Sequence, residues 1–315
     1  MENKRIKVLV IGDIMIDHYI YGNCNRISPE APVQVVEIQK EECTLGGAGN
    51  VLKNLVSFNC DVDVISVVGN DPKGKQVLEE LLTFGVSGDG ILVDHSRCTT
   101  VKSRVIASNH HLIRLDKEDV SPISSILEQE LISVFKTKVA HFDIVLLSDY
   151  NKGVLTSTLL SEIFKISTEK NITTIVDPKG ADFRKYKGVN IIKPNKKEAA
   201  IASGIEIKSA NLKEACKVIK EITGCNEVIV TLSEEGIAIF SEDDLAIIPT
   251  KALDVIDVTG AGDTVLASLA VSIAAKKPIK EACDFANHAA AIVVSKVGSA
   301  VTSFEEIERK FANDK

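Results

Sequence analysis

Short runs of consecutive apolar residues recur along the chain, and longer stretches with helical periodicity separate most of them. An uninterrupted apolar run is typical of a strand that is buried on both faces of a sheet. The runs that predict such strands lie at residues 7–11, 62–68, 144–147, 173–176, 189–192 and 227–231, and a hairpin-like pair follows at 236–240 and 246–249. Helices are predicted after a glycine-rich turn at 46–50, from about 196, and at 76–84, 126–138, 155–169, 211–223, 261–275 and 280–295. Strands separated by helices predict an α/β fold with a doubly wound, mostly parallel sheet.

Two further segments alternate apolar and polar residues and do not fit that sheet. Residues 33–38 predict a half-exposed strand, and residues 104–107 and 112–115 predict a hairpin around a turn-rich tetrapeptide. We expect these strands to form a small β lid inserted into one domain that spans residues 1–315. The lid segments are expected at about residues 18–42 and 98–116.

Composition narrows the possible functions. Of the 315 residues, 45% are hydrophobic, which is enough for a sizeable core. The chain has 37 basic and 44 acidic residues, a net charge of −7, so no nucleic-acid partner is expected. Its seven cysteines include no Cys-x-x-Cys pair. This pattern favours reduced thiols over a disulfide framework or a zinc site.

The apolar segments are too short for a membrane. The longest charge-free apolar stretch, residues 264–275, falls well below the ~18 residues of a membrane span. Asp13 and Asp17 interrupt the apolar run behind the basic N-terminus, so no signal peptide is predicted. We therefore expect a cytoplasmic protein with no membrane partner.

The strongest chemical signal is the string Asp-Val-Thr-Gly-Ala-Gly-Asp-Thr at residues 257–264, which opens a predicted helix. The backbone N–H groups of Gly260, Ala261 and Gly262 would be free to hold an anion, because helix starts leave such donors unpaired. Asp263 could accept a proton from a hydroxyl while those amides stabilise a transferring phosphoryl group. An ordinary capped helix, with Asp263 favoured by the helix dipole, is the structural alternative.

This string resembles the C-terminal signature D-x-T-G-A-G-D of the PfkB/ribokinase family of sugar kinases. The resemblance covers essentially the whole chain and implies a ribokinase-like fold, with Asp263 as catalytic base and residues 260–262 as an anion hole. A second family hallmark is a Gly-Gly-x-x-Asn turn that cradles the sugar, and Gly46, Gly47 and Asn50 match it. An Asn amide can both donate to and accept from a sugar hydroxyl. A plain turn before a helix is the alternative.

The family also uses ATP with Mg²⁺. Asn195 and Glu198 match its N-x-x-E motif, which organises Mg²⁺ and phosphate through water, although an Asn with an acid three residues later is equally a capping box. Thr231, Ser233 and Gly236 resemble the loop at the nucleotide edge, with Ser233 standing where many members have Gly.

The end of the chain completes the resemblance to an ATP site. Asn287 and Ala290 resemble the adenine pocket, and Gly260 and Gly262 would lie against the phosphates. A packed, alanine-rich helix is the structural alternative for the first pair. Residues 298–299 lie where the family often closes a site for a monovalent cation such as K⁺.

One glycine-containing string is similar to a P-loop, a different kind of phosphate-binding site. Residues 69–76 nearly read as a P-loop, but Gln76 stands where the metal-binding Ser or Thr is needed and Pro72 removes a backbone donor. The same residues fit a structural G-x-D-x-x-G turn, and we expect that role.

Two acidic residues follow the first predicted strand. Asp13 and Asp17 would lie at the carboxyl edge of the sheet, where open α/β folds bind ligands. The resemblance places sugar-binding acids in this segment, so both are predicted to contact sugar hydroxyls. Solvated loop carboxylates are the alternative.

Four segments resemble one branch of the family, which phosphorylates D-glycero-β-D-manno-heptose 7-phosphate at C1 to supply ADP-heptose for lipopolysaccharide. They are residues 26–33, 112–116, 147–153 and 177–180. A sugar phosphate requires cations at the far end of its pocket. The candidates are Arg104, Arg114, Lys152 and Lys179, with Arg26 a weaker one. A solvated surface charge is the alternative for each.

Other functions remain open at this point. The same chemistry could act on ribose, fructose 6-phosphate or a nucleoside, and a catalytically silent sugar-binding protein could share the fold. A dehydrogenase is disfavoured, because no G-x-G-x-x-G string follows the first strand. In some relatives this kinase is fused to a nucleotidyltransferase. No H-x-G-H string occurs here, so we expect that second activity on another protein. Exposed strand edges of the lid predict a homodimer.

Overall fold

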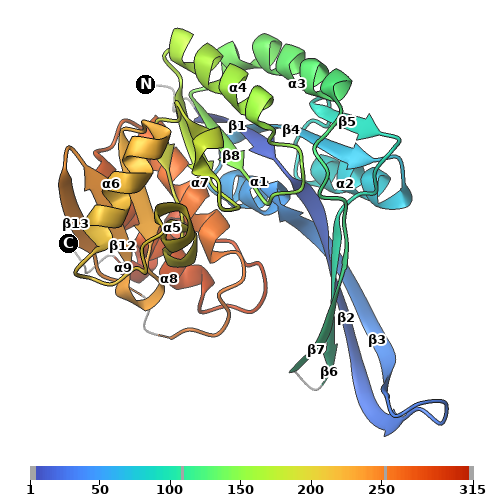
Figure 1. The fold of residues 1–315 in the computed structure, drawn as a ribbon. Helices are drawn as coiled ribbons and strands as arrows, with labels where there is room; N and C mark the ends of the chain where they lie inside the picture. Colours follow the sequence, from blue (N-terminus) through green and yellow to red (C-terminus); the bar gives the residue numbers. More distant parts are fainter. Residues whose placement is uncertain (1–4, 108–109, 252–253, 312–315) are drawn as a thin grey trace.

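A computed structural model describes residues 5–107, 110–251 and 254–311 of the chain. A large sheet forms the centre of the described structure, and a second sheet projects from one side of it (Figure 1). The large sheet has the strand order β13-β12-β11-β10-β9-β8-β1-β4-β5. Its neighbouring strands are parallel except in the pairs β11–β12 and β12–β13, which are antiparallel. The doubly wound, mostly parallel sheet predicted from the sequence is therefore confirmed.

The strands of the large sheet are mostly buried and apolar, as expected for a sheet covered on both faces. Their bounds are β1 Lys7–Gly12, β4 Asp61–Gly69, β5 Ile91–Asp94, β8 Ile144–Ser148, β9 Thr173–Asp177, β10 Ile191–Ile192, β11 Glu227–Thr231, β12 Ile237–Ser241 and β13 Asp244–Ile248.

Helices cover both faces of this sheet, and each face has its own apolar core. One face packs against α1 Ala48–Ser57, α2 Pro72–Thr83, α7 Ala261–Ala274, α8 Ile279–Val293 and α9 Phe304–Phe311. The other packs against α3 Ser125–Lys138, α4 Ser157–Glu169, α5 Lys196–Ser203 and α6 Leu212–Thr223. Among the helices that the structure describes, none combines the length and apolar character needed to cross a membrane.

The second sheet, called the lid sheet below, has the strand order β3-β2-β6-β7. It consists of β2 Ile14–Ile27, β3 Gln34–Gly47, β6 Val101–Ala107 and β7 His110–Lys117. Its strands lie within residues 14–47 and 101–117, whereas the sequence predicts lid segments at about 18–42 and 98–116. Strand β2 starts only two residues after β1 ends, so the chain passes directly from the large sheet into the lid sheet (Figure 1).

Several local predictions from the sequence were wrong. The strand predicted at 33–38 is much longer, because β3 pairs along its length with β2. Strand β2 itself was missed. Its many polar residues show no clear apolar–polar alternation, and the strand is stabilised by pairing with its neighbours. Strand β5 and helix α9 were also missed, and β10 is shorter than the run at 189–192.

The P-loop-like string at 69–76 joins β4 to α2, as the structural interpretation predicted. Asp71 caps α2 by accepting a hydrogen bond from the Gly74 N–H across 2.8 Å, and Pro72 occupies the first turn. Both features are typical helix-start signals.

The chain reverses its direction of winding between β1 and β8, which are neighbours in the sheet. A Cβ on Gly12 would lie 2.0 Å from the Ser148 carbonyl oxygen, so glycine allows the two strand ends to approach closely. Such switch points form the ligand-binding crevice in open α/β sheets. The loops after β1, β8, β9, β10 and β11 all open at this same edge.

Candidate active site

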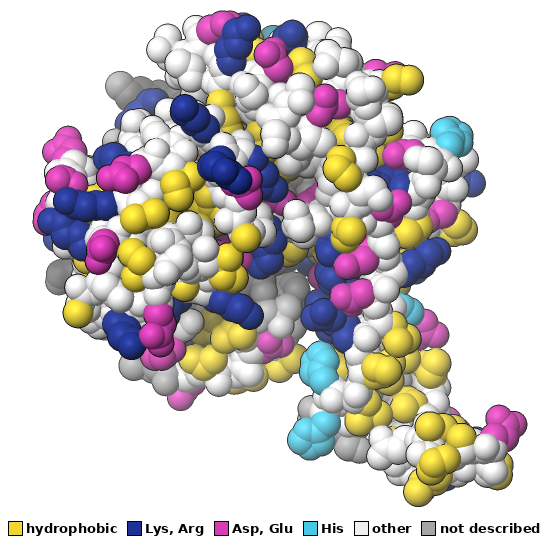
Figure 2. All heavy atoms as spheres, viewed as in Figure 1, with side chains coloured by type: hydrophobic (Ala, Val, Ile, Leu, Met, Phe, Trp, Pro, Cys, Tyr) yellow, Lys and Arg dark blue, Asp and Glu magenta, His cyan; other side chains and the backbone are white. Residues whose placement is uncertain are grey.

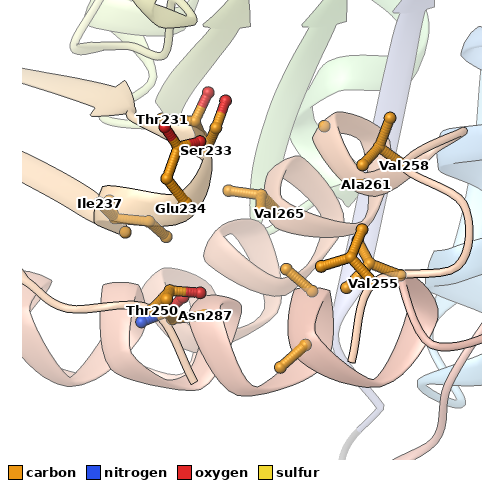
Figure 3. Close-up of a pocket in the computed structure, with 15 residues that line it drawn as sticks. Thr231, Ser233, Glu234, Ile237, Thr250, Val255, Val258, Ala261, Val265 and Asn287 are labelled. Atoms are coloured by element: carbon orange, nitrogen blue, oxygen red, sulfur yellow. The ribbon is translucent and has the colours of Figure 1, made fainter. Parts of the chain in front are cut away.

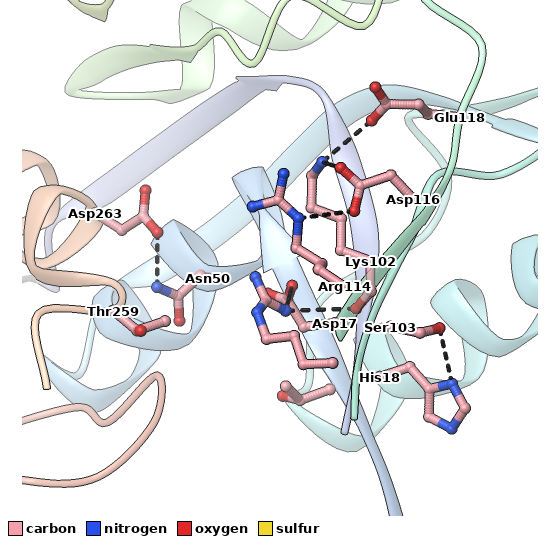
Figure 4. A network of polar contacts seen from close by, with 12 residues as sticks. Asp17, His18, Asn50, Lys102, Ser103, Arg114, Asp116, Glu118, Thr259 and Asp263 are labelled. Carbon is pink, nitrogen blue, oxygen red and sulfur yellow. Dashed lines mark hydrogen bonds and ion pairs between the residues drawn. The ribbon is translucent and has the colours of Figure 1, made fainter. Parts of the chain in front are cut away.

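Asp263 lies in the first turn of α7 and is buried at the carboxyl edge of the large sheet. Its Oδ2 accepts a hydrogen bond from Asn50 Nδ2 across 2.7 Å (Figure 4). Its Oδ1 accepts one from the hydroxyl of Tyr150 across 2.8 Å. Two donors from distant parts of the chain therefore fix the orientation of this carboxylate.

Burial raises the pKa of Asp263 above its ordinary value. The hydrogen bonds from Asn50 and Tyr150 and the charge of Lys193 act in the opposite direction. A carboxylate made more basic by burial, yet held in place by donors, is suited to accept a proton from a hydroxyl.

The turn before α7 is ordered by its own residues. Gly260 has a φ of 78°, and a Cβ there would lie 2.7 Å from Asn50 Nδ2. Asp257 accepts hydrogen bonds from the Thr259 N–H and hydroxyl, and its other oxygen accepts from the Gly298 N–H. The predicted anion hole thus consists of Gly260, the N-cap residue of α7, and Ala261 and Gly262, its first two residues. No side chain caps these N–H groups, and the Ala261 N–H donates to the Val258 carbonyl across 3.2 Å.

The glycine-rich turn at 46–50 packs against the same carboxylate. Asn50 is in the first turn of α1, and its Oδ1 is buried with no hydrogen-bond partner among the described residues. A Cβ on Gly46 would lie 2.2 Å from Asp17 Oδ2, and Gly47 has a φ of 58°. The structure therefore brings Asp17, Gly46, Gly47 and Asn50 together near Asp263, and their role as a sugar cradle stays a prediction.

Asp13 has a different environment from the one we predicted. Its carboxylate accepts hydrogen bonds from the N–H groups of Tyr150, Lys152 and Val154 at 2.8 to 3.2 Å. Burial raises its pKa to about 6, and the nearby Asp149 carboxylate adds to the shift. This carboxylate positions the loop after β8, so we correct its predicted role from sugar contact to support of Tyr150.

A second carboxylate holds the other side of the same loop. Asp149 Oδ1 accepts from the Asn151 N–H across 2.6 Å, and its Oδ2 accepts from the Tyr186 hydroxyl and Lys185. Tyr150 is consequently fixed by residues on both sides of it. Sequence reasoning noted its segment, residues 147–153, but did not identify the tyrosine itself.

The four predicted phosphate-binding cations all have carboxylate partners and fall into two separate groups. Arg104 pairs with Asp17, and Lys152 pairs with Glu118. Arg114 pairs with Asp116, as Figure 4 shows. All three cations lie beside or within the lid sheet. Lys179, by contrast, pairs with Glu198 across 2.6 Å at the start of α5. The structure does not gather these cations into one cluster.

Asn195 and Glu198 form a reciprocal capping box at the start of α5. Each side chain accepts from the other residue's backbone N–H across 2.9 Å. The capping interpretation, left open by the sequence, is therefore correct. Among the described residues, no group of three or more His, Cys, Asp or Glu side chains could hold a metal ion. The capping box is compatible with a water-mediated role of Asn195 and Glu198 toward Mg²⁺, which stays a prediction, and we derive no step through a protein-bound metal.

A buried ion pair missed by sequence reasoning lies next to the capping box. Lys193 follows β10 and pairs with Asp177 across 2.9 Å. Burial raises the pKa of Asp177 to about 7, although the Lys193 charge opposes the shift. A Cβ on Gly262 would lie 3.9 Å from Lys193 Nζ, which places this ammonium near the predicted anion hole. The position of Lys193 directly after a predicted strand is the feature of the sequence that could have identified it.

Two cavities flank the turn before α7. The first has a volume of about 300 Å³, and Figure 3 shows its walls. Residues predicted for ATP that line it are Thr231, Ser233, Gly236, Gly262, Asn287 and Ala290. Its remaining lining is largely apolar and includes Val255, Val258 and Val265. Asn195 and Gly260, also predicted for ATP, do not line this cavity.

The second cavity is larger, about 940 Å³, and lies between the lid sheet and the residues around 256–257 and 297–300. Tyr19, Tyr21, Thr44 and Lys53 line it from the lid side and α1. Gly298 and Ser299 line the opposite side.

Asp263 is therefore a buried, oriented carboxylate near both cavities: its neighbour Gly262 lines the first, and Lys53, on the same helix as Asn50, lines the second. Residues 5–306 match the sequence profile described as the pfkB family carbohydrate kinase. The chain belongs to the pfkB family of carbohydrate kinases. This confirms the family that the string at 257–263 predicted.

Curated pfkB relatives are similar along nearly the whole chain. The bifunctional protein HldE of Nitratiruptor is 50% identical over 303 residues, covering 96% of this chain and 64% of the relative. The HldE proteins of Campylobacter curvus and of Helicobacter pylori strain J99 are 48% and 45% identical and cover 97% and 96% of this chain. In both cases 65% of the relative is matched, so this pfkB chain spans less than two thirds of their length.

Solved structures confirm the pfkB fold. Ribokinase from Giardia lamblia superposes with a TM-score of 0.78 at 18% identity, covering 97% of this chain and 99% of that one. Ribokinase from Thermotoga maritima gives a TM-score of 0.76 at 21% identity, covering 98% and 100%. At this identity the similarity establishes the ribokinase-like fold alone.

Proposed function

We propose that this protein uses ATP to phosphorylate D-glycero-β-D-manno-heptose 7-phosphate at its C1 hydroxyl, giving the 1,7-bisphosphate for ADP-heptose synthesis. The observation that carries the proposal is the buried Asp263 carboxylate, held by Asn50 and Tyr150 in the first turn of α7. A carboxylate at this place can deprotonate a hydroxyl that enters from one side while a phosphoryl donor enters from the other.

The chemistry then follows from the residues around Asp263. Asp263 takes the proton of the C1 hydroxyl, and the oxygen attacks the γ-phosphorus of MgATP as the bond to ADP breaks. The N–H groups at 260–262, at the start of α7, can hold the negative charge on the transferring group. The unpartnered Asn50 Oδ1 is a candidate acceptor for a sugar hydroxyl.

The first cavity is the proposed site for the nucleoside of MgATP. Its apolar walls suit a purine ring, and Gly262 connects it to the anion hole. Magnesium would arrive with the nucleotide, because the carboxylates of Glu198 and Asp177 are already paired with lysines. A monovalent cation near residues 298–299 stays a prediction from the family resemblance.

Two observations support a heptose phosphate as the acceptor. The four segments at 26–33, 112–116, 147–153 and 177–180 resemble the heptose 7-phosphate branch of the family. That branch includes members fused to a second enzyme, and the similar HldE proteins are named bifunctional and are longer than this chain. The resemblance and the comparisons therefore point to the same branch.

Coupled ADP release against a panel of acceptors tests the proposal. The panel contains D-glycero-D-manno-heptose 7-phosphate, sedoheptulose 7-phosphate, fructose 6-phosphate and ribose. Strong preference for the heptose phosphate is the expected result. Preference for another acceptor would overturn the substrate assignment but keep the kinase chemistry. Binding of ATP with no turnover on any sugar would favour a silent sugar-binding protein.

We also propose that two copies pair through their lid sheets. The lid sheet has two free edges, β3 and β7, and every residue of β7 is exposed. Hydrophobic side chains gather on the lid sheet in Figure 2. Exposed hydrophobic residues of its strands include Ile27, Ile38 and Leu115. Exposed edges and apolar patches of this kind are typical of interfaces. Sedimentation equilibrium tests it: a dimer is expected, and a Leu115→Asp variant should shift toward monomer.

A further inference from the structure

Two lysines are buried in the part of the chain that the structure describes, and they differ in one respect. Lys193, with 2% of its surface exposed, forms an ion pair with Asp177. Lys53, with 8% exposed, forms no ion pair with a described carboxylate. Its ammonium donates one hydrogen bond, to Thr44 Oγ1 across 2.9 Å. A buried ammonium without a counter-charge is costly, so its partner is expected to be a ligand.

Lys53 lies close to the reacting carboxylate. It follows Asn50 by three residues on α1, so the two side chains share one face of the helix. Asn50 holds Asp263, while Lys53 lines the second cavity beside Thr44 and Tyr19. An acceptor with one end at Asp263 would therefore extend toward Lys53.

The carboxylates around Lys53 favour its charged form but do not pair with it. Burial lowers the pKa of Lys53, while the more distant carboxylates of Asp17, Asp263 and Glu80 act against that shift. The acids that line the cavity already have partners. Glu42 pairs with Lys40, and Asp257 accepts from Thr259 and Gly298. Lys53 is thus a buried lysine that lines this cavity and has no ion pair among the described residues.

We propose that Lys53 binds the phosphate that the sugar already carries, at the end opposite the reacting hydroxyl. This inference rests on the proposed kinase function and names a contact for the acceptor. It also revises the sequence-based choice of Arg104, Arg114, Lys152 and Lys179, each of which has a carboxylate partner. Hydroxyls of Thr44, Tyr19 and Tyr21 line the same cavity and can donate to phosphate oxygens.

The test compares Lys53→Met with the wild-type protein on two acceptors, the heptose 7-phosphate and the same heptose without its phosphate. For the phosphorylated sugar, kcat/KM is expected to fall about tenfold to a hundredfold, the usual range for a lost charge-assisted hydrogen bond. For the unphosphorylated sugar kcat/KM should stay within about twofold, and KM for MgATP should not change. Lys53→Arg should recover part of the loss.

Lys73→Met is the control, because Lys73, on α2, donates to Gln76 and to Cys43 of β3 and does not itself line the cavity. Equal losses of Lys53→Met on both sugars would overturn the proposal and show a structural role. An unchanged kcat/KM for the phosphorylated sugar would also overturn it.

Failure of the proposed function is a separate outcome of the same experiment. If the wild-type protein prefers another sugar phosphate in the panel, that sugar and its unphosphorylated form replace the heptose pair. If it turns over no sugar, calorimetric titration of the heptose 7-phosphate into both proteins decides, with weaker binding to Lys53→Met expected. Equal binding to the two proteins would overturn the Lys53 assignment.

Discussion

The hydroxyl of Tyr150 donates a hydrogen bond to Asp263 Oδ1 across 2.8 Å and so joins the loop after β8 to the first turn of α7. The opposite oxygen accepts from Asn50, which lies on α1. Three separate segments of the chain thereby converge on one carboxylate. Because each donor prefers the ionised form, the pair keeps Asp263 available as a base despite its burial.

Replacing Asp263 with Asn should remove phosphoryl transfer while the fold is kept. The amide cannot take the hydroxyl proton, and general bases contribute about a hundredfold to ten-thousandfold in rate. ADP release should fall by at least about a hundredfold, with calorimetric binding of MgATP largely retained. Asp89→Asn, an exposed carboxylate before β5, is the control and should behave as wild type. Activity of Asp263→Asn within about tenfold of wild type would exclude its role as base.

Tyr150→Phe should change the pH dependence of the reaction. Without the hydroxyl, the ionised form of Asp263 loses a donor and its pKa rises further. The base is then protonated up to a higher pH, so the acid limb of the kcat/KM profile should move upward by about one pH unit. KM for MgATP should not change. A lower rate with an unmoved acid limb would show that Tyr150 only supports the fold.

Gly260→Ala should inactivate the protein beyond its effect on stability. The left-handed backbone at this position disfavours a side chain, which costs about 1 to 2 kcal/mol of unfolding free energy. In addition, the new Cβ would lie 2.7 Å from Asn50 Nδ2 and displace the donor that holds Asp263. Gly204→Ala is a matched control, because Gly204 has a φ of 70° but no heavy atom within 4 Å of a Cβ.

Both glycine variants should lose similar stability in urea, and Gly260→Ala alone should lose most of its ADP release. Equal activity in the two variants would contradict the steric link between Gly260 and Asn50.

Asp13 should make the protein less stable as pH rises. Its pKa is about 6 in the folded chain, above the value of about 3.9 for an unfolded Asp. Between these values the folded state holds a proton that the unfolded state releases, so the free energy of unfolding falls as pH increases from about 4 to about 6. In Asp13→Asn this part of the pH dependence of the unfolding free energy should be absent. Urea titrations over that pH range test it, and parallel curves for both proteins would refute the assignment.

Much of this protein is determined by its sequence alone. Buried strands such as β1 and β8 are uninterrupted apolar runs, which local hydrophobicity specifies without reference to the rest of the fold. The string at 257–263 is equally local, since the glycines, the helix start and Asp263 are consecutive. The family and the identity of Asp263 as the candidate base could therefore be predicted.

The partners of these residues were decided only by the tertiary structure. Tyr150 is 113 positions from Asp263 in the sequence and Asn50 is 213, and the sheet's switch point is what brings them together. The same holds for charge. Asp13 faces backbone N–H groups and the predicted cations face carboxylates, while Lys53 alone among the buried lysines of the described chain lacks a counter-ion. Burial and pairing depend on neighbours that are distant in sequence, and a residue's type does not reveal them.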